Sequence, residues 1–189
     1  FRSINFNSAL CADKIGFNSV FNRDSFFHGC RGLIKKATDM KLSDNIFDEI
    51  KKKSSVLYPG IDYSLIDEAG SRELTSVPVI VWNHRWEHDK NPELFFSVLK
   101  SLKEKGLVFK LIIMGQSFKR QPSCFSEMQI HFKDELIHFG YVESKNEYAK
   151  LLKRSDIIVS TARHEFFGIS VLEAVRAGCR PLLPDALSY

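Results

Sequence analysis

The most informative segment of this chain is TARHEFFGISVLEA, which runs from Thr161 to Ala174. A short apolar run at 157–160 precedes it and predicts a buried parallel strand. Apolar residues at helical spacing follow Gly168, and Gly178 stands where such a helix would end. The segment therefore predicts a strand, a loop and a helix that opens at Gly168.

Two glutamates flank the predicted start of this helix. A helix N-terminus presents unpaired amide N–H groups and a partial positive charge, so it attracts phosphate. Gly168 has no Cβ and lets an anion approach the backbone. Glu165 and Glu173 would repel that anion, so they suit hydroxyl groups on either side of it, as in a nucleoside diphosphate sugar. On spacing alone, the alternative is that one glutamate interacts with the helix dipole and the other is a solvated surface residue.

The same residues carry a resemblance. Glu165, seven intervening residues and Glu173, with Phe167-Gly168 inside and Leu172-Glu173-Ala174 at the end, resemble the donor motif of retaining GT-B glycosyltransferases. The resemblance implies that Glu165 contacts the transferred sugar and that Glu173 holds the ribose hydroxyls. It also implies that backbone amides around Phe167, Gly168 and Ile169 hold the diphosphate.

The composition is that of an ordinary globular protein, with 189 residues, 44% of them apolar and 26% charged. This length suffices for one domain with a sizeable core or for one and a half domains. No apolar run reaches the roughly eighteen residues of a membrane span, so none is expected. Four scattered cysteines predict reduced thiols in an intracellular protein. The net charge of +4 permits a polyanionic partner without demonstrating one.

The chain divides into two blocks of predicted elements. The first has helical patterns at 8–14, 25–37 and 44–53, the last capped by Ser43, and strands at 15–19 and 55–58. Pro59-Gly60 ends this block as a turn, and the polar residues 61–77 indicate a boundary or linker. The second block has strands at 79–82, 108–114, 137–142, 157–160 and 180–183, and helices at 92–105, 127–136, 145–154 and 168–177.

Strands that alternate with helices of this length predict a parallel sheet with right-handed crossovers. Ligands of such sheets bind at the carboxyl ends of the strands. Ser144 is the predicted cap of the helix at 145–154, and Asn91 that of the helix at 92–105. The predicted core positions of the helix at 92–105 are Leu94, Phe95, Val98, Leu99 and Leu102.

Arg85 and Lys90 stand in the loop after the strand at 79–82, before a helix that Pro92 begins. Two cations there suit a diphosphate leaving group, because charge builds on its oxygen as the sugar bond breaks. The resemblance places an arginine and a lysine at matching positions. The alternative is a solvated polar loop.

Three other candidates stand after predicted strands. Gly115 lets a ligand or a neighbouring backbone come close. Gly140, Tyr141 and Val142 match the family segment that lies against the nucleotide base, although both glycines also suit ordinary strand ends. His164 could touch donor or acceptor, or be a surface residue. His84 and His88 lack a third ligand at zinc spacing and are not a zinc pair. No metal and no cofactor is expected, because the two cations and the helix end supply the positive field.

Three runs carry a narrower resemblance: FNSVFNRDSF at 17–26, VWNHRWEHDKNPE at 81–93 and STARHEFFG at 160–168. They resemble the family of tRNA-queuosine alpha-mannosyltransferases along nearly all of the chain. The resemblance implies GDP-mannose as donor, queuosine in a tRNA anticodon as acceptor, and transfer with retention. It implies Arg85, Lys90 and Glu165 as catalytic residues, in a cytoplasmic or also nuclear enzyme with no membrane and no obligate protein partner.

The resemblance also implies an α/β fold of the GT-B type. Residues 1–60 would be the remnant of an N-terminal, acceptor-side domain, and 61–77 a boundary. Residues 78–189 would be a C-terminal nucleotide-sugar-binding Rossmann-like domain, incomplete at its C-terminus. We expect the sequence to begin inside a longer one, because no leader pattern follows Phe1.

The incomplete N-terminal domain leaves two alternative functions open. One is a nucleotide-sugar-binding module without catalysis, and the other is a GT-B transferase that acts on a glycan or lipid. The basic residues Arg31, Lys35, Lys36 and 51–53 could approach tRNA phosphates, or they are solvated lysines and arginines of helix surfaces.

Overall fold

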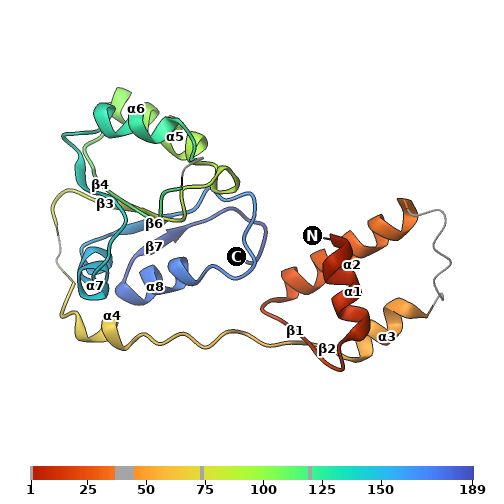
Figure 1. Ribbon diagram of the computed structural model, residues 1–189. Coiled ribbons are helices and arrows are strands. Elements are labelled where there is room, and N and C mark those ends of the chain that lie inside the picture. Colours follow the sequence, from red (N-terminus) through yellow and green to blue (C-terminus); the bar gives the residue numbers. More distant parts are fainter. Residues whose placement is uncertain (1, 37–44, 73–74, 119–120) are drawn as a thin grey trace. The chain divides into compact units, whose positions relative to one another are not determined.

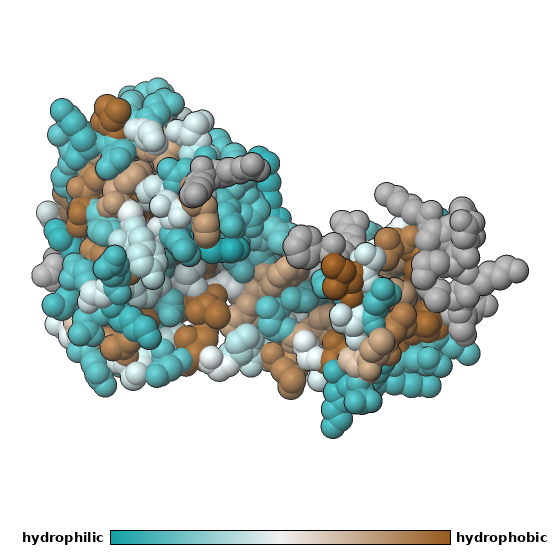
Figure 2. Space-filling view, in the orientation of Figure 1, coloured by the Kyte–Doolittle hydropathy of each residue, from teal (hydrophilic) through white to brown (hydrophobic). Residues whose placement is uncertain are grey.

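The computed structural model describes residues 2–36, 45–72, 75–118 and 121–189. The chain forms two compact units (Figure 1). The first unit comprises Phe1–Gly60, and the second unit comprises Ile61–Leu187 together with Tyr189. Hydrophilic residues dominate the visible face of the second unit, with small apolar patches between them (Figure 2).

The first unit has three helices and two short strands within its described residues. They are α1 (Arg2–Cys11), β1 (Ile15–Phe17), α2 (Val20–Lys36), α3 (Ile46–Lys52) and β2 (Ser54–Val56). The two strands pair in parallel. Aromatic and aliphatic side chains fill the core, among them Phe6, Phe17, Phe27 and Ile50. Both α1 and α2 begin earlier than predicted, and the predicted cap Ser43 lies outside the described residues.

The second unit is a parallel sheet covered by helices. Its elements are α4 (Ser64–Glu68), β3 (Val79–Asn83), the 3-10 helix η1 (His88–Lys90), α5 (Pro92–Glu104), β4 (Lys110–Met114), α6 (Cys124–His131), β5 (Leu136–Gly140), α7 (Lys145–Lys153), β6 (Ile157–Val159), α8 (Ile169–Ala177) and β7 (Arg180–Leu182). The strand order is β5-β4-β3-β6-β7, and all four pairings are parallel.

Alternation along the strands divides the core between the two faces of the sheet. Val79, Val81 and Ile158 belong to one cluster, which includes buried residues of α4, α7 and α8. Ile80 and Trp82 belong to the other cluster, which includes buried residues of α5 and α6. Figure 1 shows α5 and α6 on one face and α7 and α8 on the opposite face. Because both faces are covered, the central strands β3, β4 and β6 are largely apolar rather than alternating with polar residues.

The strand order creates a switch point between β3 and β6. From β3 the chain adds β4 and then β5 on one side, and it returns to add β6 and β7 on the other. Connections after β3 and β6 therefore diverge to opposite faces of the sheet. In an open parallel sheet this divergence leaves a crevice at the carboxyl ends of the two strands, where ligands bind.

Three predictions about single elements differ from the structure. The expected linker at 61–77 contains α4, whose Ile66 is buried in the core of the second unit. The helix predicted at 127–136 is α6 and begins at Cys124, because Leu136 pairs with Leu111 as part of β5. On α5, Leu94 and Val98 are 48% and 49% exposed.

The face of α5 that meets the sheet follows from its period. Pro92, Phe95, Phe96 and Leu99 are buried, at the i, i+3, i+4, i+7 spacing of one helix face. Phe96 was not among the predicted core positions, but it is buried, whereas Leu94 and Val98 are not. None of the described helices combines the length and apolar character that a membrane crossing requires.

Candidate functional site

The loops that follow β3 and β6 are joined by hydrogen bonds at the switch point. The Arg163 amide donates to the Asp89 carbonyl at 2.7 Å. The Thr161 hydroxyl donates to the carbonyls of Lys90, at 2.9 Å, and Asn91, at 3.0 Å. These contacts fix the two loops against each other and thereby set where their charged side chains lie.

Lys90 and Glu165 meet where these loops touch. Lys90 Nζ donates to the His164 carbonyl at 2.7 Å and lies 3.3 Å from Glu165 Oε2. Lys90 is only 6% exposed, although lysine is rarely buried. Burial alone would raise the pKa of the Glu165 carboxyl. Lys90 and the amides of Phe166 and Phe167 outweigh burial, so that this pKa lies below its ordinary value.

Glu165 also lies next to the start of α8. Its Oε1 accepts from the amides of Phe166, at 3.0 Å, and Phe167, at 3.4 Å. Gly168 caps the helix with φ of 87°, in the left-handed region that favours glycine. A Cβ on Gly168 would lie 3.7 Å from Glu165 Cγ and 3.0 Å from Cε1 of Tyr189. The first amides of α8, beginning with Ile169, are thus close neighbours of the Glu165 carboxylate.

Glu173 is held by side chains from two other elements. Tyr148 Oη on α7 donates to Glu173 Oε2 at 2.6 Å. The amide nitrogen of Asn83, at the end of β3, donates to Tyr148 Oη at 2.7 Å. Burial and the Glu173 carboxylate raise the pKa of Tyr148, which keeps its hydroxyl protonated. Sequence reasoning missed Tyr148. Its only signal was an aromatic residue on the face of α7 that buries Ala149, Leu151 and Leu152.

The side chain of Arg85 does not join Lys90 and Glu165, although Arg85 lies in the loop after β3. Its side chain is 59% exposed and forms an ion pair with Glu87 at 3.0 Å. Within the described residues, Arg85 forms no hydrogen bond or ion pair with Lys90 or Glu165. The next residue, Trp86, anchors the loop: its ring stacks on Phe125 with centroids 4.1 Å apart. The predicted pair of cations is therefore one buried lysine and one exposed arginine.

Gly115 lies so close to the backbone of the loop after β3 that no side chain fits there. A Cβ there would lie 1.7 Å from the carbonyl oxygen of His84. The His84 amide donates to the Met114 carbonyl at 3.2 Å, and the Trp86 amide donates to the Gln116 carbonyl at 2.9 Å. Of the two possibilities for this glycine, the structure shows the close approach of the loop after β3.

The remaining candidates lie at the edge of this region. Gly140 ends β5 with φ of 132° and open space where a Cβ would stand. Tyr141 is 64% exposed, whereas Val142 packs against the core cluster of α7 and α8. His164 is exposed, and its ring lies 4.5 Å from that of Phe166.

A second residue that sequence reasoning missed is His84, which is 5% exposed. Burial, reinforced by the charge of Lys90, lowers the pKa of its imidazole to about 4. Its Nε2 atom is buried and has no hydrogen-bond partner in the part of the chain that the structure describes. A neutral imidazole therefore lies among the charges of Lys90, Glu165 and Asp89.

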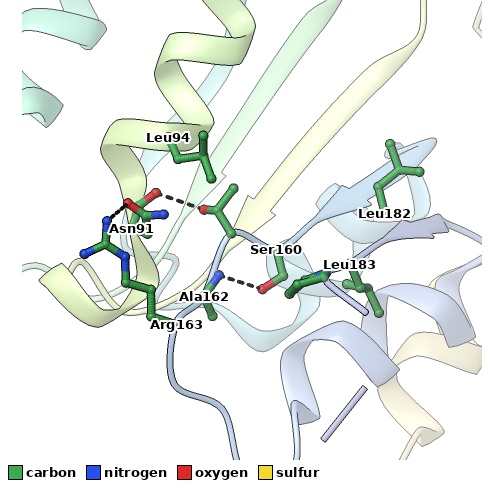
Figure 3. A pocket seen from close by; sticks show the side chains of 9 residues that line it. Asn91, Leu94, Ser160, Ala162, Arg163, Leu182 and Leu183 are labelled. Atoms are coloured by element: carbon green, nitrogen blue, oxygen red, sulfur yellow. Dashed lines mark hydrogen bonds between the residues drawn. The ribbon is translucent and has the colours of Figure 1, made fainter. Parts of the chain in front are cut away.

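A pocket of about 490 Å³ borders the same loops. Arg163 and Asn91, joined by a 3.0 Å hydrogen bond, lie at one side of it, and Leu182 and Leu183 lie at the other (Figure 3). Neither Lys90 nor Glu165 lines it. Across the described ranges, no group of three or more His, Cys, Asp or Glu side chains is placed to hold a metal ion.

Comparison with known proteins divides the chain at the same place as its structure. Residues 1–61 match a family model described as tRNA-queuosine alpha-mannosyltransferase N-terminal, and residues 67–186 match glycosyl transferases group 1. A tRNA-queuosine alpha-mannosyltransferase of Drosophila melanogaster is 37% identical over 190 residues, which cover 96% of this chain and 50% of that protein. The chain thus spans about half the length of this relative.

Solved structures share the fold. A glycosyltransferase from Rickettsia africae ESF-5 is 17% identical with a TM-score of 0.68, over 100% of this chain and 48% of its own. The crystal structure of TarM is 14% identical with a TM-score of 0.68, over 99% of this chain and 32% of its own. These likenesses show an α/β fold of the GT-B type, as the sequence predicted.

Proposed function

The chain belongs to the glycosyl transferases group 1 family, and from this premise we propose that it transfers mannose from GDP-mannose to queuosine in a tRNA anticodon, with retention of configuration. The observation that carries the proposal is the meeting of Lys90, Glu165 and the start of α8 at the switch point of the sheet. The match of residues 1–61 supports the choice of acceptor. A tRNA acceptor fits an enzyme of the cytoplasm, or also of the nucleus.

The diphosphate of the donor fits between Lys90 and the first amides of α8. As the bond from the sugar to the diphosphate breaks, negative charge accumulates on the departing oxygen. The Lys90 ammonium is already desolvated, and the helix N-terminus adds unpaired N–H groups around Gly168 and Ile169. Because Lys90 is largely shielded from water, its interaction with the developing charge is stronger than at an open surface. The proposal needs no metal ion.

The two glutamates then serve the two hydroxyl-bearing ends of the donor. Glu165, ionised and fixed by two backbone amides, accepts from hydroxyls of the mannose. Glu173, at the other side of the helix start, accepts from the ribose. Gly140 ends β5, Tyr141 and Val142 follow it, and in this proposal the three lie against the guanine through backbone groups. His164 is exposed beside Glu165 and faces donor or acceptor.

Arg85 is the second cation of the leaving-group site in this proposal. Its present partner, Glu87, is two residues away, and the pair is exposed. Exposed ion pairs contribute little to stability, so the guanidinium exchanges Glu87 for a diphosphate at small cost. The oxygens of a diphosphate can accept two hydrogen bonds from one guanidinium, so the diphosphate is at least as good a partner for Arg85 as the Glu87 carboxylate.

A product assay tests the proposal directly. The protein is incubated with GDP-mannose and tRNA that carries queuosine, and the modified nucleoside is identified by mass spectrometry and by its sensitivity to an α-mannosidase. Calorimetry with GDP-mannose is run in parallel, and rates are compared with and without EDTA. Binding without product favours the nucleotide-sugar-binding module, and product only on a glycan or lipid favours the other transferase.

Arg85→Ala measures the leaving-group role. A hydrogen bond between charged groups contributes about 1.5–3 kcal/mol, so we expect turnover to fall by about 10- to 150-fold. The control is Arg23→Ala in the first unit, since Arg23 is partly exposed and also paired with a neighbouring acid, Asp24. If Arg85→Ala kept turnover within about threefold, less than 1 kcal/mol of barrier, the assigned role would be wrong.

A further inference from the structure

We propose that Tyr148 is a positioning residue: held by Asn83, it orients the Glu173 carboxylate so that the protein selects ribonucleotides over nucleotides that lack the ribose hydroxyls. This inference rests on the proposed function, in which Glu173 accepts from the ribose. It adds Asn83 on β3 and Tyr148 on α7 to the site. Neither residue touches the substrate in the proposed function.

The direction of the hydrogen-bond chain is fixed by its end members. An ionised carboxylate only accepts, so the 2.6 Å bond between Tyr148 Oη and Glu173 Oε2 uses the tyrosine proton. Tyr148 Oη then accepts from the Asn83 amide at 2.7 Å. Both distances are at the short end for such bonds. All donors therefore point the same way, towards Glu173, and each bond polarises the next.

The three members come from three different elements, which makes the arrangement rigid. Asn83 ends β3 and is 7% exposed, Tyr148 lies on α7, and Glu173 lies on α8. Both α7 and α8 pack on the same face of the sheet through one core cluster. A glutamate on a helix surface normally has many side-chain rotamers. Here the tyrosine hydroxyl holds one of its oxygens in place before any ligand binds.

The other carboxylate oxygen is left for a ligand. Glu173 Oε1 forms no hydrogen bond within the part of the chain that the structure describes. The 2′ and 3′ hydroxyls of a ribose are neighbouring donors. One fixed carboxylate oxygen can accept hydrogen bonds from both. Because the carboxylate is already oriented, binding loses less side-chain entropy, which favours affinity. Removal of the tyrosine hydroxyl should therefore weaken the ribose contact without touching the ligand.

The experiment compares GDP with 2′,3′-dideoxy-GDP on the purified protein by calorimetry. A lost hydrogen bond to a charged group predicts that the wild-type protein binds GDP at least about 10-fold more tightly than the dideoxy analogue. In Tyr148→Phe we expect this ratio to fall to about 3 or less, with dideoxy-GDP affinity changed less than about twofold. The matched control is Tyr63→Phe, because Tyr63 packs against the same core cluster. It should keep the wild-type ratio.

A double-mutant cycle separates positioning from a general structural effect. Glu173→Gln alone should abolish the preference for GDP, and the addition of Tyr148→Phe should then change the ratio no further. If the two substitutions acted independently on the ratio, Tyr148 would not act through Glu173. Should Tyr148→Phe fail to fold, Asn83→Asp gives the same test. A carboxylate there accepts where the amide donates, and it draws the tyrosine proton away from Glu173.

The outcomes distinguish this inference from the proposed function. If the wild-type protein binds neither GDP nor UDP nor ADP, the nucleotide-sugar proposal fails. If it binds GDP with the expected preference and Tyr148→Phe retains that preference in full, only the positioning role of Tyr148 is overturned.

Discussion

His84 links the charge state of a single residue to the stability of the second unit. It is enclosed beside Lys90, Glu165 and Asp89, and its imidazole pKa is lowered to about 4, chiefly by burial. The unfolded chain binds a proton at this residue near its ordinary pKa of about 6.5. Between these two values the unfolded state holds more protons than the folded state, so stability must rise with pH.

We therefore expect His84→Gln to flatten the dependence of stability on pH. Wild-type stability should be complete above about pH 6.5 and fall by about 3 kcal/mol as the pH decreases towards 4. Urea unfolding between pH 4.5 and 7 measures this slope, and it avoids the range below about 4.5 where the lowered pKa of Glu165 adds a loss of its own. His28→Gln, at an exposed position, is the control. An unchanged slope in His84→Gln would contradict the burial of a neutral imidazole.

At the scale of elements, the site depends on how closely the loops after β3 and β4 approach each other. Three backbone contacts join them: His84 to Met114, Trp86 to Gln116, and the close approach of the His84 carbonyl to Gly115. The loop after β3 carries Arg85 and Lys90 at its two ends. A displacement at Gly115 is therefore transmitted to both predicted cations.

Gly115→Ala should be severely destabilising. Its φ of 152° and a Cβ 1.7 Å from a backbone oxygen require the loop to move, at a cost of about 3 kcal/mol or more. Gly106→Ala is the matched control: Gly106 has φ of 73° but open space around a Cβ, so only the left-handed penalty of about 1–2 kcal/mol applies. Urea unfolding gives both values. GDP affinity should fall in Gly115→Ala alone, and equal effects of the two substitutions would argue against the steric account.

Sequence periodicity predicted which segments form helices and strands better than it predicted which face of each helix is buried. The alternation of strands and helices from 79 onwards is confirmed, and so is Ser144 as the cap of α7, whose hydroxyl accepts from the Glu147 amide at 3.3 Å. Helix α4 was missed because five polar-rich residues are too few to show a period. Leu94 and Val98 were assigned to the core because apolar residues continue round α5, and only the position of the sheet shows which side is buried.

Contacts between distant segments were beyond the reach of local patterns. Lys90 and Glu165 are 75 residues apart, and they meet because β3 and β6 are neighbours in the strand order. The alternation of strands and helices predicts a parallel sheet but not which strands are neighbours in it. His84 stands in the run at 81–93 and Tyr148 on the buried face of α7, but nothing local assigns either a role, since each acquires it from residues on other elements.

At the scale of the whole molecule, every residue assigned to the donor site lies in the second unit. The first unit has a core of its own around Phe6, Phe27 and Ile50, and the second has two clusters on the faces of its sheet. A ligand that binds only the folded second unit stabilises it by an amount set by concentration over Kd. Ligand binding and damage to the first core should therefore be separable by measurements that resolve individual segments.

Ile50→Ala and Ile158→Ala are matched substitutions that test this separation. Both side chains are at most 1% exposed, so each change should cost about 2–5 kcal/mol in its own unit. We expect Ile50→Ala to leave GDP affinity within about twofold, whereas Ile158→Ala, on β6 beneath the loop of Glu165, should weaken it more. Hydrogen exchange locates the effect: GDP at 100 times its Kd should add about 2.7 kcal/mol of protection to α8 and leave α1 unchanged. Equal protection of α1 and α8 would mean that the donor site draws on both units, and the assignment of every donor contact to the second unit would then be wrong.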